Sequence, residues 1–240
     1  RGEAYLSMAP TLWDVTFRTA VAQAELEDRE MPGAYHRLGF DGPEGKIFIE
    51  TTRPELVPAC VALVAHPDDD RYKHLFGQTA KTPIFGVEVP IVAHRLAQID
   101  KGSGIAMICT FGDVTDVIWW RELKLPMRPI IGFDGRILSE GPQEVMAGNG
   151  AGLYAELAGK TVFSAKEILV KAFMESGDMV GEPKPITHPV KFFEKGDKAL
   201  EIVSTRQWYI RNGGSDRPLA EKLIGRGSEM KFHPAFIRVR

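Results

Sequence analysis

The chain of 240 residues has only two cysteines and no long hydrophobic run. Cys60 and Cys109 lie far apart inside apolar stretches, without the CxxC spacing of zinc or redox sites, which predicts two buried free thiols in a reducing compartment. No stretch approaches the roughly 18 apolar residues of a membrane-spanning helix, and the first residues lack the layout of a signal peptide. We therefore expect a cytoplasmic protein without membrane contact.

Motifs of nucleophilic and metal-dependent catalysis are also missing. HExxH and G-x-S-x-G do not occur, and GFDGPEGKIFIE fails as a phosphate-binding loop because Gly39 is one residue too far from Gly45 and Ile47 replaces the magnesium-binding Ser or Thr. A flexible acidic loop lacks the fixed geometry of a metal site, so we expect no metal. That loop holds side-chain types that can bind metals: His66, Asp68, Asp69, Asp70 and His74.

The net charge is small, −2, but it is unevenly distributed. Residues 1–159 carry 15 Lys and Arg against 22 Asp and Glu, a balance of −7, whereas residues 160–240 carry 15 against 10, a balance of +5. A basic segment on an acidic protein is a weak indication of a polyanionic partner, and a solvated charged face is the more common explanation of such a segment.

Short strands and tight turns dominate the chain. Alternating or β-rich runs predict strands at 46–52, 87–94 and 104–111 and an extended ribbon at 15–28, and Asp134-Gly135 predicts a hairpin turn. Two helices are expected: Val114 to about Lys124, and one capped by Ser164 with Glu167 and ended by Gly177. This pattern favours a mainly β, α+β fold with a barrel-like core and peripheral helices.

Two polar motifs have both structural and chemical interpretations. In KGSGIAMICTFGDVTD, Asp113 occupies the N-cap position of the expected helix and Asp116 its first turn, where acids stabilise a helix. A carboxylate at that position that is not used in capping suits a substrate ammonium group. In TTRP, Thr51 and Thr52 could cap the following segment, or could bind a ribose, a phosphate or a water together with Arg53.

These motifs, in this order, resemble those of a known family. TTRPEL, VALVAHPDDDRY and GSGIAMICTFGDVTD are similar to the editing domain inserted into the class I valyl-, isoleucyl- and leucyl-tRNA synthetases, and TRQWYIRN resembles the valyl type from bacteria. The likeness covers nearly the whole chain. It implies a single editing domain over residues 1–240, a segment of a longer protein, with residues 1–35 and 200–240 as connecting ribbons toward a catalytic core.

The resemblance also implies a closed β-barrel and an activity. That activity is hydrolysis of the ester in mischarged aminoacyl-tRNA, most readily Thr-tRNA(Val), because threonine is nearly isosteric with valine and the valyl enzymes are an established case of weak rejection of an added hydroxyl. The HIGH and KMSKS signatures are absent, so we expect no aminoacylation and no cofactor in this segment, with ATP and magnesium used by the parent core. The implied partners are the acceptor end of tRNA(Val) and that core.

Site residues follow from the matched motifs. Asp116 corresponds to the aspartate that holds the substrate ammonium, and Asp113 to an acid that recognises the threonine hydroxyl. Thr51, Thr52 and Arg53 correspond to the threonine-rich motif around the terminal adenosine and the hydrolytic water. The loop along that adenosine corresponds to Lys101, Gly102, Ser103 and Gly104.

The chain departs from the family pattern at several pocket positions. Met107 and Cys109 replace a lysine and a threonine, Leu56 replaces a threonine, and Thr110-Phe111-Gly112 replaces a Pro-Ala-His run. Met107, Cys109 and Phe111 are therefore expected to line a less polar pocket. Three alternatives stay open: isoleucyl or leucyl specificity, a degenerate domain that only binds tRNA, and an unrelated strand-rich interaction module.

Overall fold

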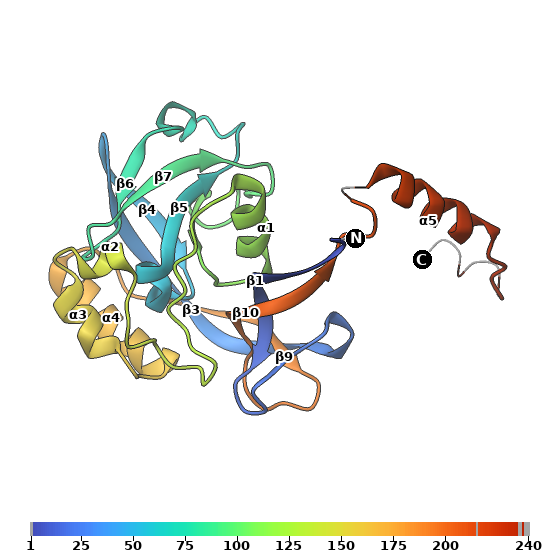
Figure 1. The fold of residues 1–240 in the computed structure, drawn as a ribbon. Coiled ribbons are helices and arrows are strands. Elements are labelled where there is room, and N and C mark those ends of the chain that lie inside the picture. Colours follow the sequence, from blue (N-terminus) through green and yellow to red (C-terminus); the bar gives the residue numbers. More distant parts are fainter. Residues whose placement is uncertain (1, 215, 235–236, 238–240) are drawn as a thin grey trace. The chain divides into compact units, whose positions relative to one another are not determined.

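A computed structural model describes residues 2–214, 216–234 and 237. The chain forms two compact units, one of residues 10–203 and a smaller one of residues 1–9 with 204–240. Each unit is described by itself below. The larger unit contains every residue predicted for the site (Figure 1).

A six-strand path forms the main sheet of the larger unit. Each strand pairs antiparallel with its neighbour except β7 and β5, which run parallel. The strand β9 (Lys184–Phe193) extends the sheet by pairing with the first part of β3. In spatial order the path is β4 (Gly45–Thr51), β3 (Leu26–Gly42), β6 (Thr79–Lys81), β7 (Glu88–Ala93), β5 (Cys60–Ala65) and β8 (Ile105–Cys109).

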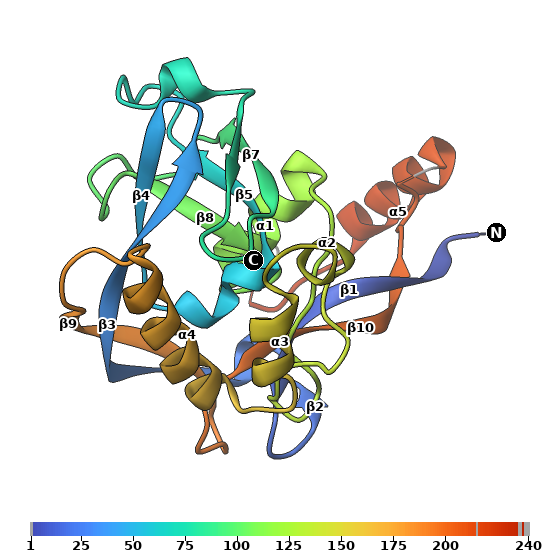
Figure 2. The ribbon, with the colours of Figure 1, turned by 90° about the vertical axis from the view of Figure 1, so that its left-hand side faces the viewer.

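The sheet curls into a half-barrel, so the predicted α+β class is confirmed and the predicted closed barrel is wrong (Figure 2). The end strands β4 and β8 approach one another, yet no hydrogen-bonded pairing joins them within the described residues. The reason is local. β8 has only five residues and pairs with β5, while a turn rather than a strand lies against β4: a Cβ on Gly102 would lie 3.3 Å from Glu50 Oε2.

The two faces of the sheet pack into separate hydrophobic clusters. Because side chains alternate along a strand, β8 sends Met107 and Cys109 to the larger cluster inside the half-barrel and Ile108 to a smaller one. Trp119 of α1 (Val114–Leu123) covers that smaller cluster. The helix after β8 is thus held against the outside of the sheet, which fixes the position of its N-terminus.

Three further helices belong to the larger unit: α2 (Gln143–Met146), α3 (Ala151–Leu157) and α4 (Val162–Ser176). The prediction that Gly177 ends α4 is confirmed, since Gly177 has a φ of 76°. The predicted cap is wrong. The helix begins three residues earlier, because the Thr161 hydroxyl accepts a hydrogen bond from Ser164 N at 3.2 Å and so satisfies a free amide of the first turn.

Short 3₁₀ turns complete the unit: η1 (Gln23–Glu25), η2 (Pro54–Ala59) and η3 (Lys73–Leu75). The three predicted strands are confirmed as β4, β7 and β8, and the predicted turn is confirmed around Gly135, whose φ is 72°. The ribbon at 15–28 is wrong in its first part. The chain turns there because Asp14 Oδ1 accepts from Thr16 N and Phe17 N, both at 2.8 Å.

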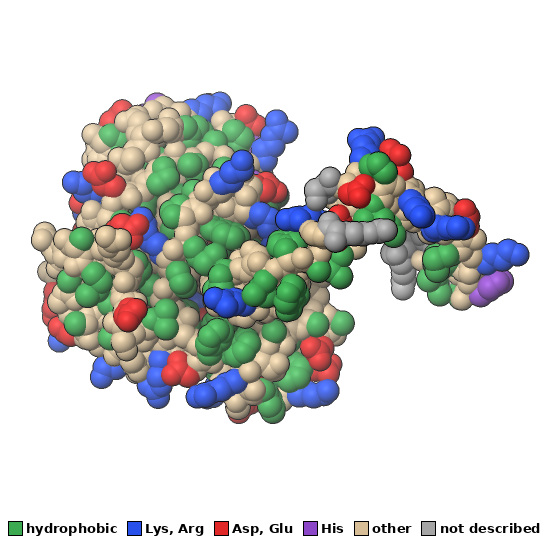
Figure 3. Space-filling view, in the orientation of Figure 1, with side chains coloured by type: hydrophobic (Ala, Val, Ile, Leu, Met, Phe, Trp, Pro, Cys, Tyr) green, Lys and Arg blue, Asp and Glu red, His purple; other side chains and the backbone are tan. Residues whose placement is uncertain are grey.

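The ribbon of β1 (Ala4–Asp14) and β10 (Glu201–Ile210) leads into the smaller unit, and β1 also pairs with β2 (Thr19–Ala20). There the Arg211 guanidinium lies 4.6 Å over the Tyr5 ring, and α5 (Arg217–Glu229) begins at the cap Asp216. None of the helices in the described part of the chain is long and apolar enough to cross a membrane. On the larger unit, charges of both signs are interspersed in the view of Figure 3.

Candidate active site

The threonine-rich segment lies at the end of β4 and is anchored from two sides. The Thr51 hydroxyl accepts a hydrogen bond from Arg53 N at 3.0 Å, which turns the chain out of the strand before Pro54 starts η2. Lys166 Nζ, from α4, donates to Thr52 O at 2.7 Å. These contacts use the Thr51 hydroxyl and the Thr52 carbonyl, and they hold the strand end in one conformation.

Arg53 is the centre of a buried ion cluster. Its Nε donates to Glu55 Oε1 and its Nη2 to Glu201 Oε2, each at 2.8 Å, and its Nη1 donates to Gly112 O at 3.3 Å. The Arg53 side chain is only 24% exposed, and both glutamates are buried. Burial raises the pKa of Glu201, and the positive charge of Arg53 opposes that rise.

The predicted helix cap is confirmed. Asp113 Oδ1 accepts from Asp116 N at 2.9 Å, and α1 starts at Val114. The Asp113 side chain is exposed, because it stands at the loop end of the helix rather than against the sheet. One carboxylate oxygen of Asp113 thus caps the helix, while the side chain as a whole is exposed to solvent.

Asp116 has the opposite environment. It is 6% exposed, and its Oδ2 accepts from Gly112 N at 2.8 Å. A Cβ on Gly112 would lie 2.8 Å from that oxygen, so the absence of a side chain at this position permits the close approach. Burial raises the pKa of Asp116 well above its usual range, and the negative charge of Asp113 adds to the rise, while backbone amides of Gly112, Cys109 and Asp113 oppose it.

A stability measurement tests this raised pKa. A carboxyl whose folded pKa exceeds its unfolded value of about 3.9 is more readily protonated when folded, so its contribution is most favourable at low pH. That contribution is lost as the pH rises from the unfolded pKa through the folded pKa. We expect the free energy of unfolding of the wild type, minus that of Asp116→Asn, to decrease over this window in urea titrations. A difference that stays constant or grows with pH would contradict the assignment.

The three residues predicted to line the pocket, two on β8 and one just after it, are all buried. Met107 and Cys109 belong to the core inside the half-barrel, and Phe111 packs edge-to-face on Trp120 with ring centroids 5.4 Å apart. The two cysteines are free and buried, as predicted, and they are cross-strand partners on β5 and β8. Burial raises the pKa of the Cys109 thiol, so β8 presents neutral groups toward the interior.

Residues 101–104, the loop predicted to lie along the terminal adenosine, contact the end of β4 at Glu50. Gly102 lies against Glu50, the residue before Thr51, and Tyr72 Oη donates to Ser103 O at 2.8 Å. Lys101 is exposed, whereas Gly104 is buried with a φ of 79°. Leu56, a departure from the family pattern, is buried in the core.

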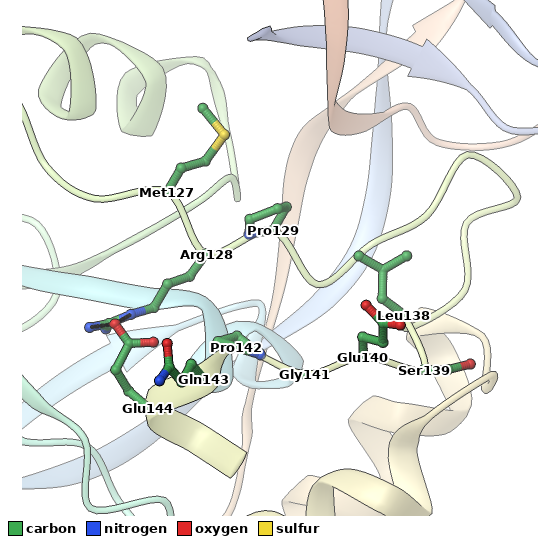
Figure 4. Close-up of a pocket in the computed structure, with 10 residues that line it drawn as sticks. All are labelled: Met127, Arg128, Pro129, Leu138, Ser139, Glu140, Gly141, Pro142, Gln143 and Glu144. Carbon is green, nitrogen blue, oxygen red and sulfur yellow. Dashed lines mark hydrogen bonds and ion pairs between the residues drawn. The ribbon is translucent and has the colours of Figure 1, made fainter. Parts of the chain in front are cut away.

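The linings of two pockets do not include Arg53 or its two glutamate partners. One has a volume of about 670 Å³ and is lined by residues 127–129 and 138–144 (Figure 4). In it the Arg128 guanidinium is bound to Glu144 and to Cys60 O, so its charge is already paired. The other, of about 400 Å³, includes Ser103 but none of the other predicted site residues. Neither pocket includes Asp113 or Asp116.

The acidic loop at 66–74 forms ion pairs. Asp69 binds Arg71 at 2.6 Å, and His74 Nε2 lies 3.4 Å from Glu44 Oε2. In the part of the chain that the structure describes, no group of three or more His, Cys, Asp or Glu side chains is arranged to hold a metal.

Sequence reasoning missed four residues of the cluster: Glu55, Glu201, His36 and Lys166. The buried His36 lies 3.4 Å from Thr51 O, and burial followed by the charge of Lys166 lowers its pKa. Glu55 directly follows TTRP and could have been suspected from a neighbouring acid and base. The other three come from distant segments, and no spacing pattern indicates them.

The structure therefore brings the threonine-rich strand end and the acid-bearing helix start together, through the contact of Arg53 with Gly112. This contact joins the two motifs on which the resemblance to synthetase editing domains rests. No family model matches the chain.

The chain is similar to part of several valine–tRNA ligases. The whole chain is 70% identical to part of a valine–tRNA ligase from Leifsonia xyli subsp. xyli, 66% to one from Thermobifida fusca and 64% to one from Cutibacterium acnes. It spans 28%, 27% and 28% of the lengths of these relatives. The resemblance to bacterial valyl-tRNA synthetases is thereby confirmed over the full length of the chain.

Proposed function

We propose that this chain is the editing segment of a valyl-tRNA synthetase and hydrolyses the ester of mischarged Thr-tRNA(Val). The carrying observation is the 3.3 Å contact from Arg53 Nη1 to Gly112 O, which sets TTRP beside the loop that bears Asp113 and Asp116. The similarity of the whole chain to part of two valine–tRNA ligases supports the same assignment. The acceptor end of tRNA(Val) and the rest of the synthetase are the proposed partners, and the cytoplasm is the proposed compartment.

Asp116 binds the α-ammonium of the misattached amino acid. Burial and then the negative charge of Asp113 raise the pKa of its carboxyl, and an arriving ammonium group would stabilise the ionised form and lower that pKa. The exposed Asp113 accepts a hydrogen bond from the threonine hydroxyl. Valine lacks that hydroxyl, so this contact distinguishes the wrong amino acid from the right one.

The strand end and the glycine loop position the ester. Thr51, Thr52 and Arg53 surround the terminal adenosine and the hydrolytic water, and residues 101–104 lie along the adenosine. An aminoacyl ester is already activated, so holding water and ester together supplies much of the rate without a covalent intermediate. The free hydroxyl of the terminal ribose assists the water. Met107, Cys109 and Phe111 supply a neutral wall that excludes bulkier side chains.

The ends of the chain connect this segment to the synthetase core. Residues 1–35 and 200–240 are proposed as the connecting ribbons, and basic residues near the second one contact the acceptor stem. Of these, Lys191 pairs with Asp28 at 2.7 Å and Lys195 with Glu194 at 3.5 Å, so their charges are partly neutralised. The other basic residues proposed for this contact are Lys198, Arg206 and Arg211. Salt-dependent tRNA binding follows from such contacts.

A deacylation series tests the proposal. Full-length synthetase carrying this segment, and the segment alone, are incubated with threonyl-, valyl- and cysteinyl-tRNA(Val), and the remaining ester is measured over time. We expect rapid loss of the threonyl ester and slow loss of the valyl ester. Preferential hydrolysis of the valyl ester would indicate a different specificity and would contradict the valyl assignment.

One observation favours a second function, tRNA binding without turnover. The buried, neutral side chains of Met107 and Cys109 replace two polar groups of the family pattern, which removes contacts that could hold the substrate. This alternative predicts unchanged binding of tRNA with no acceleration of ester loss. The same series distinguishes it from the proposed function.

A further inference from the structure

We propose that Glu201 is a positioning residue for editing, which acts on Asp116 through Arg53 and Gly112. This role rests on the proposed function and deepens it. Glu201 is the first residue of β10, just before the TRQWYIRN motif and far in sequence from TTRP and from the loop that bears Asp113 and Asp116. It enters the cluster only because the fold brings β10 to the threonine-rich strand end.

The geometry forms a continuous relay. Glu201 Oε2 accepts from Arg53 Nη2 at 2.8 Å, and Arg53 Nη1 donates to Gly112 O at 3.3 Å. Gly112 also donates its own N–H to Asp116 Oδ2 at 2.8 Å, so the glycine that Arg53 contacts is the residue that holds the carboxylate.

The relay has a consequence for the position of Gly112. A guanidinium bound to the Gly112 carbonyl fixes this glycine and, with it, the N–H that donates to Asp116 Oδ2. Glu201 and Glu55 hold the guanidinium from two sides and so fix its third contact on Gly112. Without Glu201 the guanidinium keeps only Glu55 as an ionic partner and is free to turn away from Gly112.

Asp113, at the start of the same helix, is the charged side chain that raises the pKa of Asp116, and the backbone amides of Gly112, Cys109 and Asp113 oppose that rise. Of these amides, that of Gly112 belongs to the residue that Arg53 contacts. Loss of the fixed position of Arg53 is therefore expected to weaken this donor and to make ionisation of Asp116 harder.

The test replaces Glu201 by glutamine in the full-length synthetase. Glutamine has nearly the same size and keeps one acceptor for Arg53, so the fold is expected to persist. We expect kcat for Thr-tRNA(Val) hydrolysis to fall about tenfold at neutral pH, as for loss of a charge-assisted hydrogen bond. The acidic limb of the pH–rate profile should move to higher pH, while KM and aminoacylation are unchanged.

Two comparisons separate positioning from general stabilisation. Glu144→Gln removes another Arg–Glu ion pair, at 3.0 Å from Arg128, and should hydrolyse the ester like the wild type. In an Arg53→Lys background, Glu201→Gln should add little to the loss, because both residues act through one relay. Glu201→Asp, which retains the charge, should recover part of the activity.

The outcomes are distinct. Wild-type rates and an unshifted profile for Glu201→Gln, or a loss that matches a lowered melting temperature, would overturn this role and leave the proposed function intact. A wild-type synthetase that fails to hydrolyse Thr-tRNA(Val) would overturn the proposed function and this role with it.

Discussion

Replacing Asp116 by alanine is expected to slow hydrolysis of Thr-tRNA(Val) by at least about a hundredfold, as for removal of one partner from a buried charge pair. Asp116 is the buried carboxylate beside the threonine-rich strand end, and its substitution removes the only proposed contact to the substrate ammonium. Alanine also removes the acceptor of the Gly112 N–H, which donates to Asp116 Oδ2 in the wild type. The measurement is single-turnover loss of the threonyl ester in the full-length synthetase, with aminoacylation followed in parallel.

Two variants make that result interpretable. Asp116→Asn keeps the shape but not the charge, and should be nearly as inactive if the ammonium is recognised electrostatically. Asp113→Ala should mainly reduce the preference for threonyl over valyl esters, although it also costs about 1 kcal/mol of stability because Asp113 caps α1. Unimpaired hydrolysis by a folded Asp116→Ala protein would contradict the proposed mechanism.

Replacing Gly104 by alanine is expected to destabilise the larger unit by about 3–5 kcal/mol, the range of severe steric substitutions in a packed interior. Gly104 is buried before β8 with a φ of 79°, a left-handed conformation that alone costs an alanine roughly 1–2 kcal/mol. A Cβ would also collide with the Arg71 guanidinium and lie 2.8 Å from Ile99 O and 2.9 Å from Asp69 Oδ2. Urea unfolding measures the loss.

Gly77 provides the matched control. Its φ of 85° is similar, but a Cβ there would have no neighbour within 4 Å. Gly77→Ala should therefore show only the backbone cost, about 1–2 kcal/mol. Equal losses at the two positions would mean that crowding by Asp69 and Arg71 contributes nothing.

Local signals in the sequence predicted several elements correctly. The strands β4, β7 and β8, the turn at Gly135 and the helix α1 with its cap Asp113 follow from hydrophobic alternation, turn residues and capping, all of which act within a few residues. Where two local signals competed, the prediction was wrong. Thr161 and Ser164 can both cap α4, and the structure uses Thr161. The residues after Asp14 were predicted to be extended, but they form a turn that the Asp14 carboxylate stabilises.

Closure of the sheet could not be predicted from these signals. A strand pattern specifies which faces are buried but not whether the first and last strands meet in register. Here β8 is short and a glycine turn lies against Glu50, so the half-barrel stays open between β4 and β8. The resemblance to the family implied a closed barrel because a family likeness indicates the type of fold. It contains no information on the pairing between β4 and β8.

By itself the sequence indicated the resemblance to valyl-tRNA synthetases, the two motifs and the place of both aspartates at a helix start, since these depend on residue identity and near-neighbour spacing. Only the tertiary structure decided that Asp116 is buried while Asp113 is exposed, and that Arg53 is held between Glu55 and Glu201 against Gly112. The physical reason is that burial and charge pairing depend on which distant segments the sheet brings together. Glu201, from the strand β10, has no local signature, yet it completes the ion cluster beside the strand end.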